Sequence, residues 1–367
     1  MTTEIRSALA ARLPKLVQPA VTFLTGEPTN SEVPLFRHNS ASRIASASFT
    51  LILGVSLSVG WTWGGAAFLA VVPIGLLLTT GAMRTLYVGI AHHASHGTVL
   101  DTPRANAILG DVISMLLVTL AHDRYQVEHA RDHHSPRKLS TQDDPDLRFL
   151  IDVCGFDPSR SRAWNWTQLA RILTSPRWYA TYFLARIRGS ITSPTRAVAV
   201  TFIQATVFAG LTAATKQPLA WFVGWFIPLV VGFAASAVLQ FLSEHRWLAG
   251  KPVTIARFLG DAPPNHAVGW VKWLGRAVTV HLAARVAVLV SDLSQHDLHH
   301  VMVRSDWANP SFARRDYLLA HPGRLHDAYG SLADHIDATF VAWEILARQA
   351  TATTPLPQPI LSNQSSS

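Results

Sequence analysis

The sequence predicts an all-α integral membrane protein: four transmembrane helices in two hairpins, further helices in the interfacial plane, and a histidine-rich cap on the cytosolic side. Three observations predict this class. Of the 367 residues, 49% are hydrophobic and only 15% are charged, against roughly 25% charged residues in soluble domains. Two long stretches carry almost no charge, and three short segments near apolar stretches are crowded with histidine.

The first long apolar stretch predicts a helical hairpin. Residues 44–83 contain no charged side chain, and this stretch is too long for one span, which needs about 20 apolar residues. Its middle, GWTWGG, supplies glycines for a turn and tryptophans that favour the membrane interface. We therefore expect spans at about 44–60 and 66–90.

The second apolar stretch, at 198–243, repeats this pattern. Its only charge is Lys216, in the short link ATKQP, so we expect spans at about 197–214 and 219–243. Residues 107–121 are also apolar, but they are short and include Asp111. They fit a re-entrant or interfacial helix better than a span.

The distribution of positive charge predicts the orientation. Arginine and lysine flank the apolar stretches and form no dense tract, which favours lipid headgroups over nucleic acid as their partners. The two hairpin tips hold only Lys216, so the positive-inside rule places both termini and the central region in the cytoplasm. The single cysteine, Cys154, excludes an internal disulfide and any cysteine-ligated metal site.

Outside the hairpins, composition predicts two interfacial helices and the organisation of the rest of the chain. Residues 163–189 interleave tryptophan and tyrosine with arginine at roughly helical spacing, as in a helix that lies among lipid headgroups. Residues 267–290 are similar, although they also satisfy the criteria for a fifth span. The expected organisation is a cytosolic N-terminal segment at 1–43, a membrane domain at 44–305, a cytosolic helical segment at 306–350 and a disordered tail at 351–367.

Nine of the 17 histidines are candidates for one site. Eight lie in the segments HHASH, EHARDHH and HDLHH, and the ninth ends the fourth predicted span. Residues four apart share a helix face, so His92 pairs with His96, and His129 with His133. In the predicted topology all three segments reach the same membrane face. The nine are His92, His96, His129, His133, His134, His245, His296, His299 and His300.

Other histidines have simpler interpretations. His38, His266 and His281 stand alone, and a single interfacial histidine is more often a headgroup anchor or a helix cap. His93 and His122 lie in or near the clusters but not at the positions that the repeated histidine spacing aligns, so we rank them below the nine as site residues.

Such crowding of imidazoles indicates bound metal. A zinc hydrolase needs three or four ligands and a haem needs two, so eight or nine histidines suit two metal ions better. No HExxH protease motif is present. A non-enzymatic metal-binding membrane protein is the alternative, but a carrier tends to place polar ligands along its spans, and the interiors of both hairpins lack His, Asp and Glu.

The three segments resemble a known family. They read His92-HAS-His96, His129-ARD-His133-His134 and His296-DL-His299-His300. In this order, with two spans between the second and third, they resemble the histidine boxes of integral-membrane fatty acid desaturases and their alkane hydroxylase and carotenoid ketolase relatives. The resemblance covers residues 40–305. It implies two non-haem iron ions held by the eight box histidines, with His245 as a ninth ligand.

The same resemblance suggests carboxylates that accept hydrogen bonds from the ligand imidazoles. These are Glu128, Asp132, Glu244 and Asp297. HHASHGTVL is similar to the first box of desaturases and ketolases, and STQDDPD at 140–146 resembles an acidic stretch that often follows the second box. EHARDHH and SEHRW resemble hydroxylase motifs, although Phe241 stands where the hydroxylases usually have asparagine.

The resemblance implies O2-dependent oxidation of a lipid or acyl chain in the membrane. We expect desaturation, with alkane or fatty acid hydroxylation as the alternative on the same scaffold. Because one cysteine cannot build a fused ferredoxin or rubredoxin, we expect a separate electron donor of one of these types. The arginine-rich cytoplasmic surface favours an acidic one.

Overall fold

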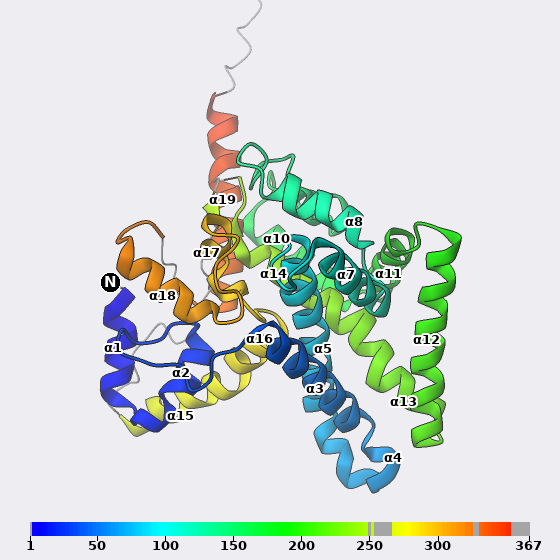
Figure 1. The fold of residues 1–367 in the computed structure, drawn as a ribbon. Helices are drawn as coiled ribbons and strands as arrows, with labels where there is room; N and C mark the ends of the chain where they lie inside the picture. The colour runs from blue at the N-terminus through cyan, green and yellow to red at the C-terminus, as the bar shows by residue number, and fades with distance from the viewer. Residues whose placement is uncertain (1, 249–250, 253–265, 326–329, 354–367) are drawn as a thin grey trace, which may run out of the picture.

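A computed structural model describes residues 2–248, 251–252, 266–325 and 330–353. Within these ranges the regular structure is helical except for two short strands, β1 (His245–Arg246) and β2 (Lys251–Pro252), which pair antiparallel. The all-α prediction is therefore confirmed (Figure 1). Of the predicted disordered tail, residues 354–367 lie outside the described residues.

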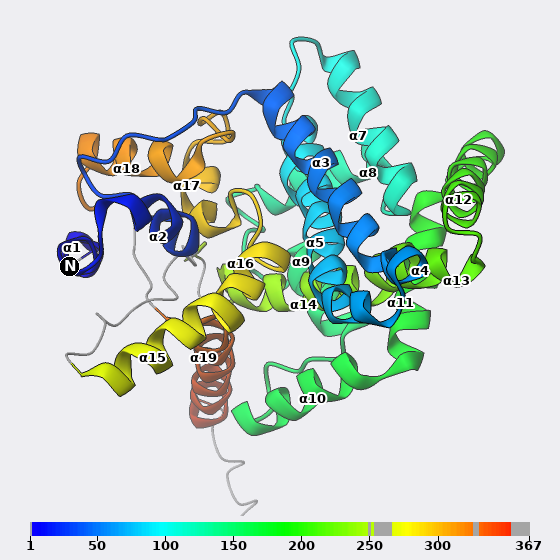
Figure 2. The same ribbon diagram turned by 90° about the horizontal axis from the view of Figure 1, so that it is seen from below.

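The first apolar stretch forms two helices that pack side by side, α3 (Ser40–Val59) and α5 (Val72–Arg84), as Figures 1 and 2 show. The short α4 (Trp61–Gly64) and the 3-10 turn η2 (Gly65–Val71) join them. The contact is close, because a Cβ atom added at Gly75 would lie 2.4 Å from the backbone nitrogen of Ser58. Glycine at this position lets the two backbones approach each other.

The second apolar stretch forms α12 (Pro194–Thr215), α13 (Pro218–Trp221) and α14 (Phe233–Glu244). Two π-helical turns, η6 (Phe222–Phe226) and η7 (Pro228–Gly232), connect α13 to α14. Lys216 has a left-handed φ of 61° at the end of α12, where the chain reverses. The helices thus begin and end close to the limits expected from the apolar pattern.

Three helical stretches are long and apolar enough to cross a membrane: Ser40–Ser95, which includes α3 and α5, Pro194–Thr215 and Pro218–Glu244. A fourth is possible if α7 (Pro103–Leu117) and the segment His122–His133, which meet at 109°, form one broken span. This bend is also what a re-entrant segment at 107–121 would show. The protein is integral to the membrane by these criteria, whereas the number of crossings stays a prediction.

Buried arginines tie α7 to its neighbours. Arg186 donates hydrogen bonds to the carbonyl oxygens of Leu117, Val118 and Leu229, and so satisfies backbone groups at the end of α7. Arg196 of α12 forms an ion pair of 2.7 Å with Asp111. The polar residue that interrupted the apolar pattern of 107–121 therefore contacts a cation on α12.

The predicted interfacial segments are helical. Residues 163–189 fall in α10 (Arg162–Thr174) and α11 (Pro176–Ser190). Residues 267–290 contain α15 (Ala267–Arg276), the π-helical η8 (Ala277–His281) and α16 (Leu282–Ala287). This second segment is not among the candidate spans found in the described residues, which disfavours the fifth-span alternative.

The two ends of the chain pack around the histidine-rich region. The N-terminal part holds α1 (Thr2–Arg12), η1 (Lys15–Val17) and α2 (Gln18–Thr25), and the C-terminal part holds α18 (Pro310–Ala320) and α19 (Leu332–Thr353). The Gln295 side chain donates to the carbonyl of Gly26, at 2.7 Å. In α19, Phe340 and Trp343 are fully buried in a cluster with Trp247.

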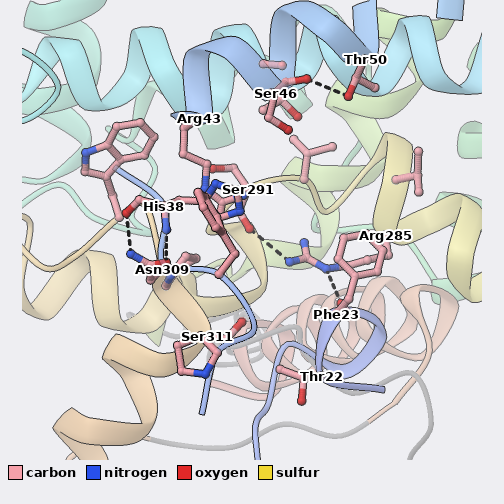
Figure 3. Close-up of a pocket in the computed structure, with 18 of the residues that line it drawn as sticks. Thr22, Phe23, His38, Arg43, Ser46, Thr50, Arg285, Ser291, Asn309 and Ser311 are labelled. Atoms are coloured by element: carbon pink, nitrogen blue, oxygen red, sulfur yellow. Dashed lines mark hydrogen bonds between the residues drawn. The ribbon is translucent and has the colours of Figure 1, made fainter. Parts of the chain in front are cut away.

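A cavity of about 520 Å³ opens between α2, α3, α5 and the start of α18 (Figure 3). Asn309 and His38 exchange hydrogen bonds at one side of it, while Arg285 donates to the Phe23 carbonyl at another. None of the nine candidate histidines lines this cavity. It is therefore separate from the site described next.

Candidate metal centre

The first histidine box ends the helix that began with α5. A π-helical stretch, η3 (Thr85–Ala91), runs into α6 (His92–Ser95), and His96 ends that helix. Wide π-helical turns are rare and occur frequently at functional sites. The Nε2 atom of His92 lies 2.8 Å from that of His299, although the two residues are 207 positions apart.

The second box lies in another π-helical stretch, η4 (Gln126–His133), which follows α8 (His122–Tyr125). The backbone N–H of His134 donates to the carbonyl of His129, five residues earlier. This wide turn places the Nε2 atoms of His129 and His134 3.1 Å apart. An α-helical argument pairs His129 with His133, but the π-helical turn directs His133 mainly toward a different set of histidines.

The third box lies in α17 (His296–Val301), which follows the 3-10 turn η9 (Leu293–Gln295). His296 and His300 meet with their Nε2 atoms 3.0 Å apart, as spacing of four in an α-helix allows. His245 joins them: the chain leaves α14 in extended conformation, and its Nε2 lies 3.0 Å from that of His296. His299 points to the first box instead.

The nine histidines thus form two adjoining groups. Within each group, one ring nitrogen from every member lies within 4.8 Å of the others. The groups touch where the rings of His134 and His300 stack, with centroids 4.3 Å apart. One group is His92, His96, His129, His134 and His299, and the other is His133, His245, His296 and His300.

This arrangement fits bound metal. Each Nε2 atom of a neutral imidazole either carries one hydrogen or presents one lone pair, so where three or more such atoms converge, at least two like groups must face each other. The buried Nε2 atoms of His96 and His133 have no hydrogen-bond partner at all among the described residues. A cation at the centre of each group would satisfy these lone pairs, and imidazole is a common ligand of iron, zinc and copper.

The electrostatic environment keeps the third-box imidazoles neutral. Burial and, after it, the nearby His133 together lower the pKa of His296 to about 3. Burial, followed by the neighbouring imidazole of His296, also holds the pKa of His300 well below its usual value. A neutral imidazole is the form that binds metal.

The four predicted carboxylates occupy different environments. Glu244 comes within 4.0 Å of the His296 Nε2 atom and accepts a hydrogen bond of 2.6 Å from Gln240. Asp297 instead forms a buried ion pair with Arg314, at 2.7 Å, and Asp132 pairs with Lys138. Glu128 lines a cavity beside the histidines.

Other carboxylates contact the imidazoles directly. The Nδ1 atom of His133 lies 2.9 Å from Asp144 and 3.4 Å from Asp146. Asp292 lies 2.8 Å from the Nε2 atom of His93. The acidic stretch STQDDPD contained the signal for the first pair, but nothing in the sequence shows which of its acids faces inward.

The remaining histidines take separate roles. His93 stacks on Trp307, with ring centroids 5.0 Å apart, and forms a third group with Asp292 and His299. His122 belongs to none of these groups. His266 caps α15 by accepting a hydrogen bond from the Gly269 N–H, as expected for an isolated interfacial histidine.

A cavity of about 180 Å³ reaches the centre from the membrane-spanning helices. Four histidines of the two groups line it: His92, His129, His133 and His296. Phe149, Phe233 and Phe241 contribute apolar walls. The ring of Tyr125 stacks nearly parallel on that of His129, at 5.3 Å between centroids. A substrate in this cavity would lie directly against the histidine groups.

Comparison with known proteins agrees with this geometry. The family model for fatty acid desaturase matches residues 66–274, more than half of the chain. The chain belongs to the fatty acid desaturase family. The match includes the first and second boxes and His245, and the third box follows it. No curated protein and no solved structure matches the chain.

Family membership gives this desaturase-family protein a general activity. It implies an oxidoreductase whose substrate is a lipid or an acyl chain. The two histidine groups are compatible with the diiron centre that is typical of the family.

Proposed function

We propose that this protein is an O2-dependent, membrane-bound diiron desaturase that introduces a double bond into a lipid-borne acyl chain. The observation that carries the proposal is the division of nine histidines into two adjoining groups. One ion would be held by the group around His92 and His129, and the other by the group around His133 and His296. When bound, two iron ions supply the redox chemistry that couples O2 reduction to cleavage of an unactivated C–H bond.

The protein's own residues hold and enclose this chemistry. Asp144 accepts the Nδ1 hydrogen of His133, which directs the Nε2 lone pair of that ring toward its group. Phe149, Phe233 and Phe241 offer an apolar surface to the substrate and restrict water. Since C–H cleavage needs close alignment, these walls would determine which carbon faces the histidines.

The net reaction needs an external reductant. In desaturation, one CH2–CH2 unit, one O2, two electrons and two protons give one CH=CH unit and two water molecules. The two electrons come from the separate ferredoxin-type or rubredoxin-type protein expected above. The cytoplasmic arginine-rich surface supports an acidic donor. The rate at which this donor reduces the protein would fall with added salt, because salt screens the attraction between them.

Hydroxylation is the second candidate, and His245 favours it. Its position 3.0 Å from His296 makes it part of the second group, and SEHRW resembles the extra motif of the hydroxylases. There, one C–H bond, one O2, two electrons and two protons give one C–OH bond and one water. Both reactions begin with the same step, removal of a hydrogen atom from a CH2 group, so the proposed site is shared.

One experiment tests the function. The protein is expressed in a host of known lipid content, purified for metal analysis, and the host lipids are analysed by mass spectrometry. Desaturation predicts two irons per chain and products lighter by two hydrogens, whereas hydroxylation predicts products heavier by one oxygen. One zinc per chain with unchanged lipids would favour the non-enzymatic metal-binding alternative.

A variant pair makes the test specific. His134→Ala should abolish the new lipid, because it removes a member of the first group. His321→Ala is the matched control, since His321 is exposed on α18's end and belongs to neither group. Equal product from both variants would contradict the assignment of the site.

We also propose four crossings with both termini and the histidines on the cytoplasmic side. Cysteine labelling tests this in a Cys154→Ser background. Lys216→Cys should react with a membrane-impermeant thiol reagent from the non-cytoplasmic side, and Arg137→Cys, just after the second box, only after permeabilisation. Labelling of both from one side would overturn the orientation.

A further inference from the structure

One buried cation beside the metal centre has no anionic partner. Arg84, the last residue of α5, is 1% exposed and lies in the membrane-spanning part of the chain. Among the described residues, no carboxylate lies within ion-pair distance of its guanidinium group. Within this part of the chain, its Nε atom has no hydrogen-bond partner, its one side-chain hydrogen bond is donated to Gln240, and its guanidinium lies over the Phe233 ring. A charge placed this way in a membrane protein is a marker of function.

Arg84 lines the same cavity as the histidines. The link to the centre is short: Arg84 donates to Gln240, Gln240 donates to Glu244 at 2.6 Å, and Glu244 lies 4.0 Å from the His296 Nε2 atom. Two side chains therefore separate the guanidinium from a candidate ligand.

Three tyrosines add polar groups to this cavity. Tyr87, Tyr125 and Tyr182 all line it, and their hydroxyl groups have no hydrogen-bond partner among the described residues. Tyr87 and Tyr125 lie close together, with ring centroids 5.1 Å apart. Hydroxyl groups inside a protein usually find a partner. Together with the free N–H of Arg84, they offer several donors to whatever occupies the cavity.

A plain saturated chain does not fit these observations. A methylene segment next to Arg84 would exclude water from the guanidinium and the hydroxyl groups and would offer them no hydrogen-bond acceptor in return. Leaving polar groups without partners in a buried site is unfavourable. Phe149, Phe233 and Phe241 add apolar lining, and the Arg84 guanidinium lies over the Phe233 ring, 4.8 Å from its centroid. The cavity is also small, at about 180 Å³, below the roughly 300–1,000 Å³ of usual ligand pockets. It suits a short segment with both an apolar and an oxygen-bearing part.

We propose that the substrate carries an oxygen acceptor, a carboxylate or a carbonyl, within a few bonds of the oxidised C–H group, and that Arg84 binds this acceptor. Oxidation then takes place near the oxygenated end of an acyl chain, not at its middle or its methyl end. This inference rests on the proposed function, because it takes the two histidine groups as the site of oxidation.

Binding of small probes tests the inference on the purified iron-loaded protein. The probes are hexanoate for the carboxylate, 2-heptanone for the carbonyl and heptane as the analogue without an acceptor. A hydrogen bond to a charged group contributes about 1.5–3 kcal/mol, so at least one oxygenated probe should bind about tenfold to hundredfold more tightly than heptane. The better of the two identifies the acceptor.

Variants assign the preference to Arg84. Arg84→Met should remove it while leaving heptane binding unchanged, and Arg84→Lys should keep part of it. Met83→Leu is the control, because Met83 is buried in the same helix but does not line the cavity. If Arg84→Met does not fold, Tyr87→Phe should weaken the same preference by removing one donor.

The outcomes separate this inference from the proposed function. Equal or tighter binding of heptane to the unaltered protein would overturn the inference, as would a preference that persists in Arg84→Met. Either result leaves two irons per chain and lipid oxidation intact. Conversely, a protein that binds no iron would refute the function, and the probe preference would then be measured on the protein as purified.

Discussion

Replacing Asp144 with asparagine should weaken one of the two metal positions and spare the other. Asp144 is fully buried, and its two oxygens lie 2.9 and 3.1 Å from the Nδ1 atom of His133. The same carboxylate accepts hydrogen bonds from the backbone N–H groups of Ser140 and Asp146. In Asp144→Asn the amide oxygen can retain a backbone bond, so the loop should persist while the charged contact to His133 is lost.

The magnitude follows from the number of bonds. His133 offers one Nδ1 hydrogen, so one charge-assisted hydrogen bond is at stake, which is worth about 1.5–3 kcal/mol. Substitution of a carboxylate behind a metal-bound histidine typically lowers metal affinity by about 10- to 100-fold. The two estimates agree. His133 belongs to the four-histidine group and not to the five-histidine group around His92. The ion of the five-histidine group should therefore remain bound.

Metal content measured against chelators of increasing strength provides the assay. The unaltered protein should hold two irons per chain until the iron affinity of the chelator exceeds that of the protein. Asp144→Asn should release one of the two irons to a chelator whose affinity is about 10- to 100-fold lower. Asp143→Asn, an exposed neighbour, is the control and should behave as the unaltered protein. Release of both ions together, or no change in threshold, would refute the assignment of His133 to a separate metal position.

Three further predictions concern stability. Trp343→Ala should lower the free energy of unfolding by about 3–5 kcal/mol, because this fully buried ring joins α19 to the core; a change below about 1 kcal/mol in thermal or denaturant unfolding would contradict that packing. Arg314→Met should destabilise by about 3–5 kcal/mol by leaving Asp297 buried without its cation, and adding Asp297→Asn should recover much of the loss in a double-mutant comparison. Gly75→Ala should lower the melting temperature through its clash with the α3 backbone, whereas Gly210→Ala, which meets open space, should not; equal melting temperatures would argue against close packing of α3 and α5.

The membrane-spanning helices were predictable because the length of each apolar stretch can be counted directly from the sequence. The limits of α12 and of the helical stretch Pro218–Glu244, and the reversal at Lys216, follow from one apolar stretch with a single charge in its link. That the three boxes would meet was also predictable, since a topology with two spans between the second and third boxes returns the chain to the same side.

How the histidines divide was not predictable. Spacing arguments assume α-helical turns, but η4 is π-helical. His129 therefore meets His134 at 3.1 Å, while His133, still beside His129, joins the group around His296. Glu244 was expected and lies 4.0 Å from the His296 Nε2 atom, but other carboxylate partners escaped prediction for a related reason. Sequence neighbours such as Asp132 and Asp297 share a helix with the ligands but face cations elsewhere, while Asp144 approaches from a separate loop.

The π-helical stretches before and within the boxes have an evolutionary consequence. Each residue of an α-helix advances the side-chain direction by about 100°, so removing a single residue from Thr85–Ala91 would swing His92 away from His299 without altering the hydropathy of the segment. One-codon insertions and deletions in these wide turns can therefore reset which imidazoles face each other. Relatives that share every histidine but differ by one residue there would be expected to assemble differently shaped centres.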